Sequence, residues 1–239
     1  MNSNKTIGIT GASGSLGIAL TKRFENNGYK IIGFTHNKNI LKKSNYGTIK
    51  WIYWESGKEI LLKKYLKEID ILILNHGIYE NNNKVNNLEK SIEINALSNL
   101  RILNLFEQIL LENKDELTKK EIWINTSEAE IFPAFSPSYE ISKLLIGQII
   151  SFKKFFIEKN IKNRLRIRKI ILGPFKSELN PIGIMNPDLV AFLIYVFSKM
   201  NINLIVVSLN PMSYILFPLK EIYYFFYSII LIFLKKQRS

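Results

Sequence analysis

A tyrosine and a lysine four residues apart, Tyr139 and Lys143 in the stretch SPSYEISK, have the types and spacing for proton transfer. Residues four apart are neighbours on a helix. A phenol has an ordinary pKa of about 10, and a nearby ammonium group lowers that pKa by favouring the phenolate. The pair therefore predicts a general acid and base, with Tyr139 giving a proton in carbonyl reduction and taking one in alcohol oxidation.

A hydroxyl upstream of this pair completes the expected chemistry. Ser127 stands at the end of the apolar run EIWINTS and is expected to hold the substrate oxygen against Tyr139 by a hydrogen bond. Thr126 in the same run is the alternative, although Ser127 better fits the end of a strand. A lone tyrosine and lysine pair is usually surface decoration, so the interpretation depends on these groups occurring together.

The elements that must position these residues follow from the hydrophobic pattern. Short apolar runs alternate with helical patterns, including expected helices over 88–113 and 138–159, and IDILILN is apolar throughout, as in a central parallel strand. This predicts an α/β fold, a Rossmann-type doubly wound parallel sheet of about seven strands. We expect one domain over residues 1–210 and an apolar, basic tail over residues 211–239.

The turn after the first expected strand, TGASGSLG, has the character of a phosphate-binding turn. Its glycines are spaced as GxxGxxG and open a helix, where backbone N–H groups can approach a pyrophosphate. A tight turn without a ligand is the alternative. The cofactor contacts expected here are Gly11, Ser13, Gly14, Ser15, Leu16 and Gly17.

The end of the second expected strand bears on which dinucleotide binds. An acidic residue there would bind the ribose 2′-hydroxyl of NAD, whereas a basic one favours the 2′-phosphate of NADP. The stretch FTHNKNILKK has no acid, and Thr35, His36 and Lys38 are expected to meet a phosphate. The sequence therefore predicts NADP(H) in preference to NAD(H).

The chain resembles the short-chain dehydrogenase/reductase family over roughly residues 5–210, because its motifs come in the family's order. TGASGSLG is similar to the glycine motif, LNHG to the NNAG segment and YEISK to the YxxxK motif. IEINALS, INTS and LGPFKS are similar to the segments with the family's asparagine, serine and PG pair. More narrowly, ILNHGI, NTSEAE and LGPFKSELNPIG resemble a cyanobacterial branch labelled sterol desaturase/short-chain dehydrogenase.

The resemblance implies a catalytic set and further cofactor contacts. Asn95 would organise a water that links Lys143 to solvent, and Lys143 would also reach the cofactor ribose. Glu55 would take the adenine-side acid position, although a surface acid is equally expected there. His76 departs from the family's small residue and either lines the site or packs. The implied catalytic residues are Asn95, Ser127, Tyr139 and Lys143, and the further cofactor contacts are Glu55, Asn75, His76, Gly77, Tyr139, Lys143, Gly173, Pro174 and Phe175.

Composition excludes several function classes. The chain has no cysteine and only two histidines, so thiol chemistry and a His-rich metal site are not expected. Its net charge of +13 is scattered rather than gathered in a basic block, which argues against a nucleic-acid partner. No apolar signal segment precedes the first expected strand, so we expect a cytoplasmic location, with association with a membrane left open.

The C-terminal tail is unusual for a soluble enzyme. Ile222–Leu234 is almost wholly apolar but too short to span a bilayer, and Pro218, Lys220 and Glu221 interrupt its extension. A helix apolar all round is not expected to face solvent. Three roles remain open: peripheral membrane contact, favoured by the tyrosines and the terminal KKQR, a homo-oligomer interface, or packing within the chain.

The motifs together predict an NAD(P)-dependent oxidoreductase that interconverts a carbonyl and an alcohol on a small, lipophilic or uncharged substrate. One alternative is a dinucleotide-binding sensor or scaffold without catalysis, although such a protein has no need of Tyr139. Another is an epimerase or dehydratase acting on nucleotide sugars, which the spacing of the glycines allows. The short C-terminal region leaves little room for a domain that binds a sugar nucleotide.

Overall fold

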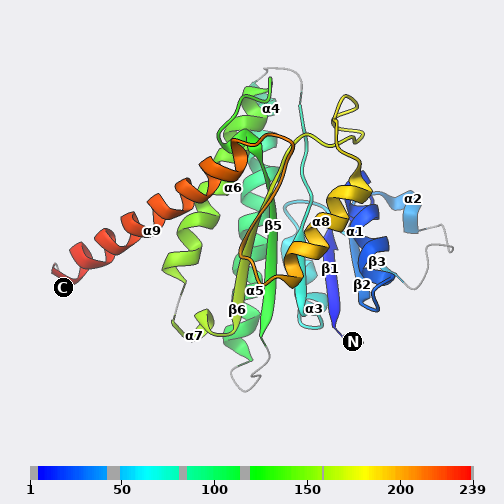
Figure 1. The fold of residues 1–239 in the computed structure, drawn as a ribbon. Helices are drawn as coiled ribbons and strands as arrows, with labels where there is room; N and C mark the ends of the chain where they lie inside the picture. Colours follow the sequence, from blue (N-terminus) through cyan, green and yellow to red (C-terminus); the bar gives the residue numbers. More distant parts are fainter. Residues whose placement is uncertain (1–4, 42–48, 81–84, 114–118, 158, 238–239) are drawn as a thin grey trace.

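Seven parallel strands form one sheet, in the order β3-β2-β1-β4-β5-β6-β7 (Figure 1). The computed structural model of the protein describes residues 5–41, 49–80, 85–113, 119–157 and 159–237. Within these residues the expected doubly wound, Rossmann-type sheet is confirmed. The strands are β1 (Thr6–Thr10), β2 (Lys30–Thr35), β3 (Lys50–Tyr53), β4 (Ile71–Leu74), β5 (Lys120–Ser127), β6 (Leu165–Leu172) and β7 (Leu204–Val207).

Helices connect the strands and cover both faces of the sheet. The helices are α1 (Ser15–Glu25), α2 (Lys38–Leu41), α3 (Lys63–Leu66), α4 (Val85–Ile92), α5 (Ser98–Glu112), α6 (Pro137–Phe156), α7 (Lys159–Lys162), α8 (Pro187–Lys199) and α9 (Ser213–Gln237). Two 3₁₀ turns are η1 (Glu59–Leu62) and η3 (Glu128–Glu130), and one π turn is η2 (Glu93–Leu97). The helix expected over 88–113 is therefore divided by η2.

The side chains of each strand alternate between two apolar cores. On β4, Ile71 and Ile73 face the core that α1 and α8 cover, whereas Leu72 and Leu74 face the core under α5 and α6. A central strand buried on both sides has apolar residues throughout, which explains the unbroken run IDILILN. Each fully buried Ile or Leu contributes about 1.5–3 kcal/mol, so this double burial fixes the register of β4.

The strand order reverses between β1 and β4, which pair with each other in parallel. At such a switch point the two connections leave the sheet on opposite faces and open a crevice at the carboxyl ends of the strands. The turn after β1 carries the three glycines, and the turn after β4 carries Asn75, His76 and Gly77. The fold thus brings the expected cofactor turns to one edge of the sheet.

The C-terminal segment forms one continuous helix, contrary to the expectation that Pro218, Lys220 and Glu221 interrupt it. By length and composition, the 22 residues Ser213–Leu234 are long and apolar enough to cross a membrane. Pro218 removes one backbone hydrogen bond. The ion pairs that Lys220 and Glu221 make with buried side chains of the body offset that loss. Helix α9 packs against α6 and β7 and then extends away from the body (Figure 1).

Candidate active site

Tyr139 lies in the first turn of α6, where Ser136 and Pro137 begin the helix. The Ser136 hydroxyl accepts a hydrogen bond from the backbone N–H of Tyr139 at 3.4 Å, and Pro137 occupies the first helical turn, where its missing N–H costs nothing. One turn later, the Nζ atom of Lys143 lies 5.6 Å from the centre of the Tyr139 ring. The predicted pair therefore shares one face of the helix.

Ser127, at the end of β5, forms a hydrogen bond with the Tyr139 side chain and also accepts one from the backbone N–H of Ala129 at 3.2 Å. Thr126, the alternative, is buried and donates to the backbone oxygen of Ile170 at 3.2 Å. Because successive side chains of a strand point to opposite faces, Thr126 faces away from Tyr139. The structure places Ser127, and not Thr126, beside the tyrosine.

The electrostatics of the pair differ from the sequence-based expectation. Burial raises the pKa of Tyr139, and the hydrogen bond from Ser127 opposes that rise. Burial also lowers the pKa of Lys143 to about 8, against the attraction of Glu130, which raises it. The expected lowering of the tyrosine pKa by Lys143 is therefore not found, because the ammonium group lies against the ring and loses its own hydration.

Asn95 lies in the π turn η2 and is fully buried. Its side chain accepts a hydrogen bond from the backbone N–H of Ile78 at 2.8 Å and donates to the Ser142 hydroxyl at 2.9 Å. A Cβ atom on Gly77 would lie 2.9 Å from Asn95 Oδ1 and 3.6 Å from Lys143 Nζ. The turn after β4 thus bonds the asparagine and passes close to the lysine.

His76 lies in a chain of hydrogen bonds rather than in an open pocket. Thr10 Oγ1 is 2.8 Å from its Nδ1 atom, and Ser98 Oγ is 3.2 Å from its Nε2 atom. Ser98 donates to the buried carboxylate of Glu59 at 2.8 Å, so it accepts from Nε2–H, and Arg101 holds Glu59 from the other side. The imidazole is neutral in this chain and fixes the turn that carries Gly77.

Replacement of His76 by Gln is expected to remove an acid sensitivity of folding. Burial, aided by the charge of Lys143, lowers the pKa of His76 to about 3. Because the unfolded chain takes up this proton near its ordinary pKa of about 6.5, stability falls as the pH drops below that value, by up to about 1.4 kcal/mol per unit. The free energy of unfolding in urea at pH 7.5 and pH 5 measures this slope. His36→Gln, at an exposed position, is the control, and parallel slopes for the wild type and His76→Gln would contradict the expectation.

The glycine turn fits a dinucleotide pyrophosphate. Gly11 has a φ of +61°, and a Cβ atom on Gly17 would lie 2.2 Å from the backbone oxygen of Gly11, so neither position accepts a side chain. Gly14 is exposed, and it begins α1 without a side-chain cap or an acid in the first turn. The first N–H groups of α1 therefore remain available to an anion, beside Ser13, Ser15 and Leu16.

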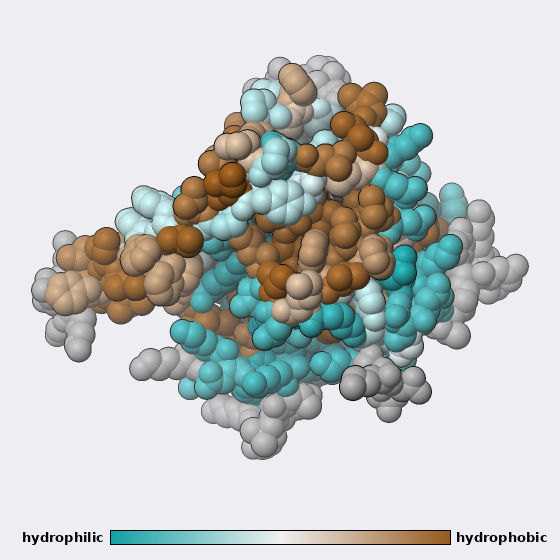
Figure 2. All heavy atoms as spheres, viewed as in Figure 1, coloured by the Kyte–Doolittle hydropathy of each residue, from teal (hydrophilic) through white to brown (hydrophobic). Residues whose placement is uncertain are grey.

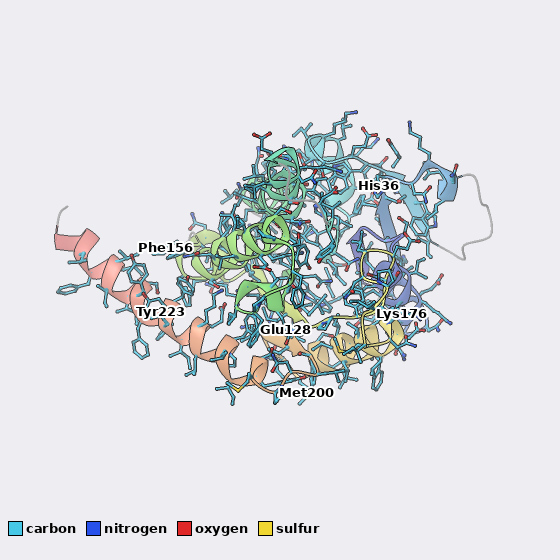
Figure 3. The ribbon with its side chains drawn as sticks, turned by 90° about the horizontal axis from the view of Figure 1, so that it is seen from above. His36, Glu128, Phe156, Lys176, Met200 and Tyr223 are labelled. Atoms are coloured by element: carbon cyan, nitrogen blue, oxygen red, sulfur yellow. The ribbon has the colours of Figure 1, made fainter. Side chains whose placement is uncertain are left out.

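The residues expected around the adenosine half lie at the ends of β2 and β3. Thr35 is buried, and its hydroxyl lies 2.7 Å from the Ser13 hydroxyl, which joins the two turns. His36 and Lys38 are exposed, and His36 lies on the opposite side of the molecule from Tyr223 of α9 (Figure 3). Glu55 is paired with Lys58 at 2.8 Å and also bonds the Tyr53 hydroxyl, which gives its carboxylate partners of its own.

The segment after β6 borders the same edge of the sheet. Gly173 is buried beside Ser208 and Glu128, Pro174 is exposed, and Phe175 pairs with Met185 to close the loop over 176–184. Exposed apolar side chains stand on the rim: Phe135 is 95% exposed and Ile182 is 91% exposed. No group of three or more His, Cys, Asp or Glu that could hold a metal occurs among the described residues.

Two groups at the site were missed from the sequence. The ring of Tyr79 packs at 5.1 Å from the ring of Tyr139, and its hydroxyl donates to the backbone oxygen of Ala134 at 2.9 Å. Glu130 is buried three residues after Ser127, and its charge raises the pKa of Lys143. The sequence could have indicated Tyr79 through its position, two residues after Gly77 of the expected cofactor turn.

Comparisons with known proteins agree with this geometry. Residues 7–144 match the model of the NAD dependent epimerase/dehydratase family. The chain is 38% identical to the monoglucosyldiacylglycerol epimerase of Synechocystis sp. over 223 residues, and these residues make up 92% of this chain. It spans about half of that relative's length, 53%. The likeness to a cyanobacterial protein agrees with the expected branch.

Solved structures show the same fold. A short chain dehydrogenase from Burkholderia cenocepacia in complex with NADP matches with a TM-score of 0.76 at 14% identity, over 90% of this chain and 92% of that one. A short-chain dehydrogenase from Sphingobium yanoikuyae in complex with NADPH matches with a TM-score of 0.71 at 15% identity, over 87% and 90%. The expected resemblance to short-chain dehydrogenases is thereby confirmed at the level of the fold.

Proposed function

Because this chain belongs to the NAD dependent epimerase/dehydratase family, we propose that it oxidises and re-reduces one secondary alcohol of a sugar and so inverts that carbon. The observation that carries the proposal is the partly buried group formed by Ser127, Tyr139 and Lys143, which lies beside the turn at Gly77. A simple interconversion of alcohol and carbonyl, the expectation from the motifs, uses the same residues for half of this cycle.

Each residue has one task in this reaction. Ser127 holds the sugar oxygen, and Tyr139 takes its proton as a general base and later returns it as a general acid. Lys143 and Asn95 exchange that proton with solvent through the turn after β4. A bound nicotinamide dinucleotide supplies reversible hydride transfer. For inversion, the carbonyl carbon of the oxidised sugar must present its other face to the returning hydride. The sugar must therefore be able to turn within the site.

We infer that the sugar is carried by a lipid, as in the name of the Synechocystis relative. The rim beside the catalytic group bears exposed apolar side chains, Phe135, Ile182 and Ile184. Lys176 is the one cation of the loop over 176–184, whereas a sugar nucleotide would need cations for its diphosphate. An uncharged hexosyl diacylglycerol therefore suits this rim better than a nucleotide sugar.

NADP(H) remains our proposal for the preferred dinucleotide. The exposed side chains of His36 and Lys38 follow β2 directly, where the 2′-phosphate of the ribose would lie, and the sequence has no acid between residues 26 and 54. Fluorescence titration with NADPH and NADH measures the preference. Tighter binding of NADH would contradict it.

Incubation of the purified chain with a monoglucosyl diacylglycerol and catalytic dinucleotide is expected to yield the epimeric glycolipid, separated by chromatography. With deuterium on the reacting carbon, an epimerase returns the label to its product, because the hydride leaves and comes back within one cycle. Accumulation of reduced dinucleotide in step with a keto product would instead indicate a dehydrogenase. Turnover of a nucleoside diphosphate sugar in preference to the lipid would contradict the proposed substrate class.

A further inference from the structure

Helix α9 buries a narrow stripe and exposes the rest of an apolar surface. Ser213, Phe217, Tyr224 and Ser228 are buried at spacings of four or seven residues, so this stripe contacts the body along the helix. The opposite face is open to solvent, with exposed fractions of 51% for Ile222, 60% for Phe226, 55% for Ile230 and 61% for Phe233. Isolated apolar residues on a surface are ordinary, but a continuous face of this length marks an interaction site.

Buried charges hold α9 in a fixed orientation. Lys169, on β6, is fully buried and contacts Glu130 at 2.8 Å and Glu221 of α9 at 3.1 Å. Lys220 of α9 contacts the same Glu130 at 2.9 Å. Two consecutive residues of α9 are thus tied to the core, so the exposed face points in one direction relative to the active site.

A basic groove lies beside α9, at the end of the sheet opposite the catalytic residues. It has a volume of about 750 Å³, and Phe225 of α9 and Phe155 of α6 form part of its wall. Its cationic side chains are Lys119, Lys154, Lys162, Arg164 and Arg166. Among the described residues, Glu121 is the one carboxylate that lines it, and Arg168 binds that carboxylate at 2.8 Å. Lys154 is paired with Glu221 of α9 at 3.0 Å.

We propose that the exposed face of α9 and this basic groove form one docking surface for an anionic lipid bilayer. Figure 2 shows the hydrophobic arm of α9 above the hydrophilic lower part of the body. An exposed apolar helix beside cations binds a bilayer by burying its apolar area and by attracting anionic lipids. The acyl chains would take up Phe226, Ile230 and Phe233, while lipid phosphates would pair with the groove.

Charge favours the bilayer over a second copy of the chain. Each copy carries a net charge of +13, and a symmetric pair formed through α9 would bring two basic grooves close together. A bilayer with anionic lipids supplies both the apolar partner and the counter-charge, and each Lys or Arg near its surface adds to binding. Tyr223 and Tyr227 stack with their rings 6.1 Å apart and stand at the depth where aromatic residues meet headgroups.

The surface is tested with the full-length chain and sedimenting vesicles of phosphatidylcholine, with or without phosphatidylglycerol. The wild type is expected to bind vesicles containing phosphatidylglycerol about tenfold more tightly, less so at high salt. Phe226→Ser/Ile230→Ser/Phe233→Ser is expected to weaken binding by about tenfold or more. Lys119→Glu/Lys162→Glu, at exposed positions of the groove, is expected to abolish the preference for the anionic vesicles.

Matched variants separate this surface from folding and from turnover. Ile60→Ser/Leu61→Ser changes two residues of η1 that are 66% and 62% exposed, and it is expected to bind vesicles as the wild type does. Tyr139→Phe is expected to bind vesicles normally although its turnover is strongly lowered, so failure of docking and failure of the proposed function are distinguishable. A wild type that ignores vesicles, or a triple variant that binds them fully, would overturn the proposal. The proposal would also be overturned if the triple variant changed the protein from a dimer to a monomer without weakening its binding to vesicles.

Discussion

Replacement of Tyr139 by Phe is expected to lower kcat by about 10²–10⁴-fold, the range that a positioned proton donor and acceptor contributes. The substitution removes only the hydroxyl that bonds Ser127 and keeps the ring that packs at 5.1 Å against Tyr79. The ring contact with Lys143 also remains. Folding should therefore be unchanged, and the loss should fall on turnover.

Steady-state kinetics on the glycolipid, together with thermal unfolding and dinucleotide titration, measure this effect. Tyr79→Phe is the matched control, because it removes a neighbouring phenol hydroxyl that donates to the Ala134 backbone oxygen. It is expected to retain kcat within about threefold, since a neutral hydrogen bond contributes only about 0.5–1.5 kcal/mol. Full activity in Tyr139→Phe would show that another group moves the proton.

Replacement of Lys169 by Met is expected to lower the free energy of unfolding by about 3–5 kcal/mol, the usual result of removing one partner of a buried ion pair. Lys169 and Glu130 have no exposed side-chain surface. Without the ammonium group, Lys220 is the one cation of the described residues still paired with Glu130, and Glu221 keeps Lys154 and the Ser151 hydroxyl. Part of the charge then stays buried without compensation.

Urea unfolding of the wild type and the variant gives the difference. Lys50→Met is the control, because the Lys50–Glu68 pair is exposed and such pairs contribute about 0–1 kcal/mol. The double variant Lys169→Met/Glu130→Gln is expected to recover part of the loss, since it removes both charges. If Lys169→Met were as stable as the wild type, the buried ion pairs of Lys169 would contribute nothing to folding.

The sequence predicted the parts of the site that depend on local spacing. The four-residue interval of Tyr139 and Lys143, the glycines between β1 and α1, and the apolar runs of the strands each follow from the period of one element. Their meeting at one edge follows from the rule that parallel strands end together at a switch point. The preference for Ser127 over Thr126 rested on the expected end of the strand, and β5 does end at Ser127.

The rest depended on contacts between elements distant in the chain. The hydrogen-bond partners of the His76 ring come from β1 and α5, and Glu59 of η1 in turn bonds Ser98, so no local sequence pattern indicates that these elements meet. The π turn at Asn95, Glu93–Leu97, contains no Gly or Pro that would mark it in the sequence. The depressed pKa of Lys143 and the raised pKa of Tyr139 arise from burial, which the sequence alone does not give.

Gly147 of α6 leaves the space that the buried carboxylate of Glu130 occupies. A Cβ atom there would lie 2.0 Å from the Glu130 carboxyl carbon, so only a bare backbone lets this acid lie between α6 and Lys169. The same acid binds Lys220 and acts on Lys143. Truncation of the chain at residue 210, for example to improve solubility, would therefore remove Lys220 and Glu221. Glu130 and Lys169 would each lose one ion-pair partner in the interior.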